Sequence, residues 1–468
     1  MVLRKTHTLI QRKASGLKRV QNWLREYIAE KELTYYIETY GCQMNNHESE
    51  KIAGVLESLG YCHESDKVKA DVIVFNTCCI RQHAEAKLNS NVGALKDHKK
   101  TRKNAVIVVS GCMMQQEEAA KKLMTRFPFV DIAFGTNAIH RLDQMLCDVL
   151  SEGKRVIYTD EDESIVEDVP AKRQAIPTAY VNIIYGCNNF CTYCVVPYVR
   201  GRERSRKSDD IFREIRTLAD QGISEIVLLG QNVNSYGNDA DGNVAFPQLL
   251  RRIDSETNIK RLRFMTSHPK DMSDALIECY GSVASLCEHI HLPVQSGSNR
   301  ILEAMNRGYT REHYLSLLRR LKARVPSLAV TTDIIAGFPG ETDEDFDMTL
   351  SLVEEAGFDA AYTFAYSPRH MTKAAGLPDH ISKQAKKERL GHLNALIKSS
   401  MQRRNAAYLG QTVEVLIDSH SRRSQTEIGG RTRTAKTVNL EGQKEEIGSF
   451  VTVEIDKIMV HTLRGRRV

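Results

Sequence analysis

The chain has 468 residues, and its 41% of hydrophobic residues is enough for several packed domains. It has no apolar stretch as long as a membrane span, and the first residues, 1–5, lack the apolar run of a secretory signal. The sequence therefore excludes a membrane protein and predicts a cytoplasmic one. The formal net charge of +6 is modest, but the positive charge is clustered, which suits a polyanionic partner.

Residues 1–32 form a basic extension with eight Lys or Arg against three Glu. Strand and helix patterns alternate over residues 33–150, where short apolar runs such as 71–76 and 105–110 are typical of buried parallel strands. We expect a doubly wound α/β domain there. The acidic stretch within residues 151–172 is then predicted to be a linker.

Six further strand patterns alternate with helices over residues 173–403, which predicts a partial (β/α)6 barrel with its function at the carboxyl ends of the strands. These strands are expected at 179–184, 225–229, 261–266, 289–294, 330–336 and 360–366. From residue 404 to 468 the helical period gives way to short alternating runs, expected as strands at 412–417, 433–438 and 449–455. They predict a small antiparallel β-barrel.

Three of the eleven cysteines lie on one short loop, directly after the first strand of the partial barrel. Cys187, Cys191 and Cys194 have the spacing C-x3-C-x2-C. Three thiolates on a 4Fe-4S cluster leave one iron without a protein ligand, which a small molecule can then bind. The alternative is a zinc site, but zinc prefers paired spacings with four ligands, and no fourth Cys or His lies nearby in sequence.

A second set of cysteines is dispersed over the N-terminal domain. Cys42, Cys78 and Cys112 each follow a predicted strand of the same sheet. Because the carboxyl ends of parallel strands meet at one edge, we expect the three thiols to converge and hold a second cluster. Burial in the core is the ordinary alternative for a single cysteine, and it is our interpretation for Cys62, Cys79, Cys147, Cys279 and Cys287.

The loop with its aromatic residue Tyr193, and the six βα units, resemble the radical S-adenosylmethionine (SAM) superfamily. The segments 39–45 (Thr-Tyr-Gly-Cys-Gln-Met-Asn), 76–78 (Asn-Thr-Cys) and 111–113 (Gly-Cys-Met) are similar to signatures of the methylthiotransferases. This resemblance spans residues 33–467 and identifies the C-terminal barrel as a TRAM domain. The Gly-Cys-Gln-Met-Asn motif is most similar to that of the branch that modifies N6-isopentenyladenosine at tRNA position 37.

The resemblance implies two 4Fe-4S clusters and SAM as cofactors, with no acid or base residue in the chemistry. One SAM methylates a sulfur of the auxiliary cluster, and a second yields a radical that removes the hydrogen from adenine C2. Positions at the ends of the barrel strands suit contacts with SAM or the substrate, with strand capping as the alternative. These predicted contacts are Tyr193, Gln231, Asn232, Gln295, Ser296 and Asp333. The family usually has Pro-Gly after Arg369, where this chain has His370 and Met371.

Clustered arginines predict the contacts with RNA phosphates, although a solvated surface is the alternative for each run. The predicted set is Arg200, Arg202, Arg204, Arg206, Arg431 and Arg433. The expected partners are a tRNA anticodon stem-loop carrying isopentenyladenosine, an electron donor such as flavodoxin or ferredoxin, and a donor of sulfur or clusters. A monomer without a membrane partner is expected.

Four rival functions belong to other classes. They are methylthiolation of threonylcarbamoyladenosine-37 in tRNA, methylthiolation of a ribosomal protein residue, RNA binding with structural zinc, and a different radical SAM reaction in which the second cluster only transfers electrons. The basic terminal barrel favours RNA over a protein substrate, because RNA offers phosphates that it can neutralise.

Overall fold

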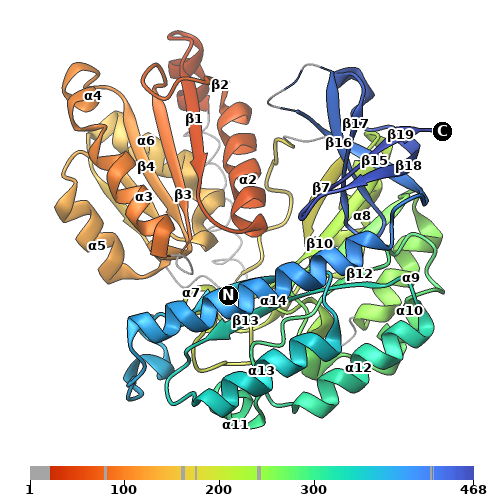
Figure 1. Cartoon of the computed structure of the whole chain (residues 1–468). Helices are drawn as coiled ribbons and strands as arrows, with labels where there is room; N and C mark the ends of the chain where they lie inside the picture. Colours follow the sequence, from red (N-terminus) through yellow and green to blue (C-terminus); the bar gives the residue numbers. More distant parts are fainter. Residues whose placement is uncertain are drawn as a thin grey trace, which may run out of the picture. The chain divides into compact units, whose positions relative to one another are not determined.

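The computed structural model describes residues 22–78, 82–159, 164–173, 177–239, 244–421, 424 and 426–468. Cys79 and most of the basic extension lie outside the described residues. The chain forms two compact units, one comprising residues up to Gln174 together with Tyr198–Gly201, and the other comprising the rest (Figure 1). None of the helices among the described residues has the length and apolar character needed to cross a membrane.

The N-terminal unit is built on a parallel sheet with the order β2-β1-β3-β4-β5-β6. Its strands are β1 (Thr34–Thr39), β2 (Cys62–His63), β3 (Val72–Thr77), β4 (Val106–Gly111), β5 (Ile132–Phe134) and β6 (Val156–Tyr158). Its helices are α2 (Gln43–Leu59), α3 (Gln82–Gly93), α4 (Lys96–Thr101), α5 (Glu117–Arg126) and α6 (Leu142–Glu152), with a further helix over 22–29 and 3-10 turns η1 (Cys112–Gln115) and η2 (Thr136–Arg141).

Two separate hydrophobic cores cover the two faces of this sheet. On one face Val72 and Val74 of β3 pack with apolar residues of α2 and α6. On the other face Ile73 and Phe75 pack with residues of α3 and α5. Alternate side chains of a buried strand point to opposite faces, so the near-continuous apolar strands follow from burial on both sides. The predicted doubly wound architecture is confirmed.

The stretch predicted as a linker belongs in part to this unit. Strand β6 lies within it and pairs in parallel with β5. Further along, the Arg173 guanidinium pairs with Glu50 of α2 at 2.9 Å. The short apolar run of residues 156–158 completes the sheet edge, although acidic residues dominate the sequence that follows it. The beginning of the predicted linker thus contributes a strand to the sheet.

The second unit begins with six parallel strands, as predicted, in two groups with the orders β7-β10-β11 and β12-β13-β14. A parallel bridge between Leu262 and Leu286 connects the two groups. The strands are β7 (Thr178–Asn182), β10 (Glu225–Leu229), β11 (Arg261–Phe264), β12 (His289–His291), β13 (Ala329–Ala336) and β14 (Ala360–Ala365).

Helices alternate with these strands, and one large core of apolar residues joins the two layers. The helices are α8 (Ser208–Asp220), α9 (Phe246–Glu256), α10 (Asp274–Cys279), α11 (Asn299–Ala304), α12 (Arg311–Arg324), α13 (Asp343–Ala356) and α14 (Lys383–Ala406). Short elements add α7 (Val196–Arg200), the antiparallel pair β8 (Ile184–Tyr185) and β9 (Arg204–Ser205), and 3-10 turns η3 (Val233–Ser235), η4 (Pro269–Asp271) and η5 (Lys373–Gly376).

The C-terminal residues close into a five-stranded barrel with the order β15-β16-β17-β19-β18, in which only β17 and β19 pair in parallel. Its elements are β15 (Thr412–His420), β16 (Glu427–Thr432), β17 (Thr437–Glu441), η6 (Lys444–Glu446), β18 (Phe450–Ile458) and β19 (Leu463–Arg467). The strand expected at 433–438 is wrong. Residues 433–436 form the turn between β16 and β17, where Ala435 has a φ of 60°.

Buried arginines hold this small barrel against the larger one. Arg261 and Arg263 extend from β11 and donate to backbone carbonyls of residues 431–433, at 2.6–2.8 Å. Arg263 also pairs with the buried carboxylate of Glu225 at 2.7 Å. In return Arg433 donates to both carboxylate oxygens of Glu288 and to the carbonyl of Leu286. The joint therefore consists of charge-assisted hydrogen bonds.

We predict that Arg263→Ala lowers the free energy of unfolding by about 3–5 kcal/mol, because Glu225 would stay buried without its partner. Urea unfolding followed by circular dichroism measures this loss, and limited proteolysis reports release of the small barrel. Arg466→Ala is the matched control, since Arg466 is 71% exposed and pairs with Glu454 at the surface. Its loss should stay below about 1 kcal/mol. Similar losses in both variants would contradict this account of the joint.

Candidate metal centres

The three dispersed cysteines meet at the carboxyl edge of the N-terminal sheet, as expected. Cys42, Cys78 and Cys112 follow β1, β3 and β4, which are neighbours in the sheet. Gly41 has a φ of 143°, and a Cβ there would approach the Cβ of Cys78 to 2.7 Å. Only glycine permits this close approach of the two loops.

Buried amides fix the first two of these loops. Asn45 accepts a hydrogen bond from the Cys42 thiol at 3.2 Å and donates to Asn76 Oδ1 at 3.1 Å. Asn76 returns a hydrogen bond to the Asn45 carbonyl at 2.8 Å and donates to Ser49 Oγ at 3.0 Å. This network crosses from α2 to β3, so the Asn residues of the Gly-Cys-Gln-Met-Asn and Asn-Thr-Cys segments position the cysteines.

Arg200 is also part of this site and belongs to the same unit. Its guanidinium is buried, donates to Cys112 Sγ at 2.8 Å and pairs with Glu48 at 2.7 Å. Interaction with the Cys78 thiol, assisted by Arg200, lowers the pKa of Cys42 to about 6, although burial and Glu48 oppose this shift. Two donors of Arg200 are thus directed at groups inside the protein, and its contact with RNA phosphate stays a prediction.

The loop that carries Cys187, Cys191 and Cys194, called here the consecutive cysteine loop, lies in the second unit, after β7 and β8. Arg307 is buried and donates to Cys191 Sγ and to Tyr193 Oη, each at 3.3 Å. Asn306 donates to the Asn189 and Phe190 carbonyls, and this holds Phe190 at a φ of 47°. The segment after α11 therefore shapes the loop. Sequence analysis missed Arg307, because its contact with Cys191 spans 116 residues and has no local pattern.

Cys42 differs from Cys187 and Cys194 in its affinity for protons. Burial raises the pKa of Cys187 to about 11 and that of Cys194 to about 12, whereas the pKa of Cys42 is lowered. Among the described residues no group of three or more His, Cys, Asp or Glu is arranged to hold a metal ion. A 4Fe-4S cluster makes a looser geometric demand, since each thiolate binds a different iron.

Most of the predicted contacts with SAM or the substrate lie at the ends of barrel strands. Asn232 is buried, its side-chain amide nitrogen donates to Asp271 at 2.7 Å, and its side-chain oxygen Oδ1 has no partner among the described residues. Asp333 lies 3.5 Å from His291, and Gln231 follows β10. Gln295 has a φ of 72° and pairs through its backbone with β13.

Ser296 is fully buried, and its hydroxyl lies 3.3 Å from that of Thr349 in α13 and accepts from the Ser298 amide. A Cβ at Gly297 would collide with the backbone of α13. This segment therefore packs against α13, and Ser298 caps α11. The contact of Ser296 with SAM or the substrate stays a prediction.

The predicted phosphate contacts divide into buried and accessible residues. Arg206 is buried and pairs with Glu214 at 2.7 Å, and Arg433 is engaged at the joint, while their contact with phosphate stays a prediction. Arg202 lies over the Phe190 ring at 4.4 Å, and Arg204 is half-buried in β9. Arg431 remains 54% exposed and pairs with Asp418 at 3.2 Å.

The remaining cysteines follow the expectation only in part. Cys279 and Cys287 are buried, as predicted, and Cys147 is half-buried. Cys62 is exposed on the two-residue edge strand β2, so its assignment to the core is wrong. An edge strand leaves one side open to solvent, which the residue type alone does not reveal.

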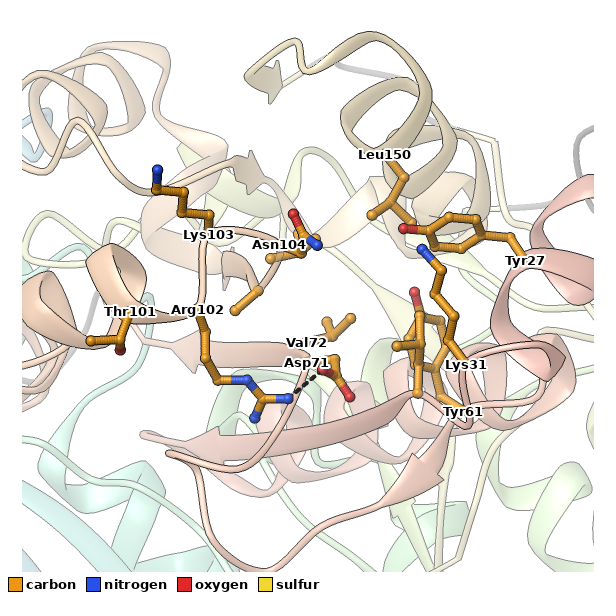
Figure 2. A pocket seen from close by; sticks show the side chains of 13 residues that line it. Tyr27, Lys31, Tyr61, Asp71, Val72, Thr101, Arg102, Lys103, Asn104 and Leu150 are labelled. Carbon is orange, nitrogen blue, oxygen red and sulfur yellow. Dashed lines mark hydrogen bonds and ion pairs between the residues drawn. The ribbon is translucent and has the colours of Figure 1, made fainter.

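A cavity of about 480 Å³ lies at the opposite edge of the N-terminal sheet, where β3 and β4 begin (Figure 2). Tyr27, Lys31, Tyr61 and Arg102 are among the residues that line it, and Arg102 points to Asp71 at 2.6 Å. It contains none of the predicted site residues. The chemistry indicated by the cysteines lies instead at the carboxyl edge, where open α/β sheets bind ligands.

Six parallel strands with three cysteines after the first define a radical SAM enzyme, and the comparisons agree. The Radical SAM superfamily model matches residues 181–353, a model described as uncharacterized protein family UPF0004 matches residues 34–135, and the TRAM domain model matches residues 406–468. The structure of the radical SAM methyltransferase TsrM from Kitasatospora setae has a TM-score of 0.52 at 15% identity, and the match covers 74% of this chain and 77% of that one.

Similar proteins over nearly the full length carry one name, tRNA-2-methylthio-N(6)-dimethylallyladenosine synthase. The protein from Clostridium tetani is 48% identical over 93% of this chain and 96% of its own length. That from Caldicellulosiruptor saccharolyticus is 50% identical over 93% and 92%, respectively. The chain belongs to this family of radical SAM methylthiotransferases, whose cofactors are SAM and 4Fe-4S clusters.

We predict that metal-free protein is alkylated by iodoacetamide first at Cys42. A pKa lowered to about 6 keeps the reactive thiolate populated above pH 6, whereas Cys187 gains it only as the pH approaches about 11. Peptide mass spectrometry after short exposure between pH 5 and pH 9 measures each site. Labelling of Cys42 should rise through pH 6 and then level off. Equal labelling of both residues at pH 7 would contradict the assigned electrostatics.

Proposed function

We propose that the chain adds a methylthio group to C2 of N6-isopentenyladenosine at position 37 of tRNA. Two sets of three cysteines, each at the carboxyl ends of parallel strands, carry this proposal. The substrate comes from the name shared by relatives that are 47–50% identical. Methylthiolation of threonylcarbamoyladenosine-37 or of a ribosomal protein residue is the alternative for the same chemistry.

Cys187, Cys191 and Cys194 would hold one 4Fe-4S cluster, and Cys42, Cys78 and Cys112 would hold the auxiliary one. The donor sets fit, because each provides three thiols beside one buried arginine, which offsets part of the thiolate charge. Three ligands leave one iron of each cluster open. Bound clusters supply the electron for reductive cleavage of SAM and the sulfur that enters the product.

The protein side chains bind and orient in this scheme, and no acid or base is required. Arg307 holds the Cys191 thiol and Tyr193, so that the loop keeps one shape. The unpaired side-chain oxygen Oδ1 of Asn232 offers an acceptor for the ammonium group of SAM. Gln231, Gln295 and Asp333 remain candidates for the ribose and the substrate. The adenine must reach the site unstacked.

RNA contacts are proposed for the accessible arginines. Arg431 is exposed in the TRAM barrel, and its pair with Asp418 is near the surface, so exchange for a phosphate costs little. Arg202 and Arg204 follow the cysteine loop and suit phosphates close to the reacting base. Shape and exposed loop bases would then supply specificity.

The reaction also needs partners that bring electrons and sulfur. A low-potential donor such as flavodoxin or ferredoxin and a donor of sulfur or clusters fit this chemistry. We propose a cytoplasmic monomer, since tRNA is modified in that compartment.

We predict that Cys78→Ala abolishes methylthio product but leaves reductive cleavage of SAM, because only the auxiliary set loses a ligand. The assay uses full-length, anaerobically reconstituted enzyme with isopentenylated tRNA, dithionite and SAM. Mass spectrometry of digested tRNA detects the product, and chromatography detects 5′-deoxyadenosine. Cys62→Ala is the control, since Cys62 is exposed and outside both sets. Methylthio product from Cys78→Ala would overturn the proposal, and so would the absence of product from the wild type. Product formed only with threonylcarbamoylated tRNA would change the assigned substrate.

We predict that Arg431→Ala weakens tRNA binding and lowers the slope of log affinity against log salt by about one, as for one lost phosphate contact. Filter binding at several salt concentrations measures both quantities. Arg320→Ala is the charge-matched control, because Arg320 of α12 pairs with Asp274 of α10, outside the predicted RNA contacts. The same change in both variants would indicate a general effect of charge and remove Arg431 from the interface.

A further inference from the structure

The Arg200 guanidinium donates hydrogen bonds to two different groups of the auxiliary site, a carboxylate and a thiol. One terminal nitrogen pairs with Glu48 Oε1 at 2.7 Å, and the other donates to Cys112 Sγ at 2.8 Å. Arg200 and Glu48 are both only 5% exposed. A guanidinium withdrawn from water interacts strongly with the charges around it, because little solvent screens them.

The position of Arg200 in the chain is as specific as its contacts. It ends α7, six residues after Cys194, and belongs to the segment Tyr198–Gly201 that is part of the N-terminal unit. Glu48 lies on α2, six residues after Cys42. An ion pair with a purely structural role needs only the carboxylate, whereas this arginine directs its second donor to a thiol.

We propose that Arg200 is a positioning residue that sets the reduction potential of the auxiliary cluster, and that Glu48 shifts this potential in the opposite direction. This inference rests on the assignment of Cys42, Cys78 and Cys112 as ligands under the proposed function. Hydrogen bonds to ligand sulfurs and nearby charge are established determinants of cluster potentials. A potential tuned in this way controls whether the cluster keeps its electrons while sulfur leaves it.

The sign of the effect follows from charge. Reduction adds one negative charge to the cluster, so a positive neighbour favours the reduced form and a negative neighbour disfavours it. Removing the charge of Arg200 should therefore lower the reduction potential, and removing that of Glu48 should raise it. A role in folding alone predicts no such opposition, because both substitutions break the same ion pair.

The test uses the full-length chain with Cys187, Cys191 and Cys194 replaced by Ala, so that only the auxiliary cluster can assemble. Arg200→Gln, Arg200→Lys and Glu48→Gln are each added to this background. Iron and sulfide analysis measures cluster content, and a redox titration followed by electron paramagnetic resonance measures the potential. Arg206→Gln is the matched control, since Arg206 is a buried arginine paired with Glu214 in the other unit.

We expect a lower potential for Arg200→Gln, a higher one for Glu48→Gln, a value near the parent for Arg200→Lys, and no change for Arg206→Gln. Cluster retention in Arg200→Gln should fall about 10- to 100-fold, as for other lost contacts to metal ligands. If Arg200→Gln holds no cluster, Glu48→Gln decides: a potential above that of the parent supports the proposal, and an equal or lower potential refutes it. Unchanged potentials refute it as well. A parent that holds no cluster refutes the ligand assignment itself.

Discussion

Parallel pairing of three neighbouring strands is the constraint on which the N-terminal site depends. Strands β1, β3 and β4 run in the same direction, so the residues that follow them meet at one edge although 70 positions separate Cys42 from Cys112. Any shift in register would move a thiol away from the other two. The apolar faces of the strands fix that register through two cores, one on each side.

Buried arginines recur wherever this protein must join distant parts of the sequence. Arg200 reaches a thiol and a carboxylate of its unit, Arg307 holds the consecutive cysteine loop, and Arg261 and Arg263 bind the small barrel. The planar guanidinium satisfies several acceptors in fixed directions, which a lysine cannot do. Each of these arginines therefore links distant segments through hydrogen bonds in fixed directions. The groups around it decide whether its positive charge stabilises the fold or influences a metal centre.

The sequence revealed the fold and the cysteine sets because both leave local signals. Apolar runs mark the buried strands, and a cysteine directly after such a run is placed by topology alone. The roles of Arg200, Arg206 and Arg433 were not predictable, because their partners lie far away or on other elements. A run of basic residues looks the same whether it faces RNA or pairs internally, and only the fold separates Arg431 from Arg433. Ser296 is ambiguous for a similar reason, since a polar residue at a strand end can equally pack against a helix.

The discontinuous N-terminal unit also shows why sequence-continuous domain boundaries are insufficient. Residues 33–150 contain most of the sheet and the three cysteines, but the guanidinium beside them comes from residue 200. Without it, Glu48 would be a buried carboxylate lacking its partner, a costly arrangement. The segment 198–201, which follows the cysteine loop in sequence, therefore belongs to the electrostatics of the N-terminal site.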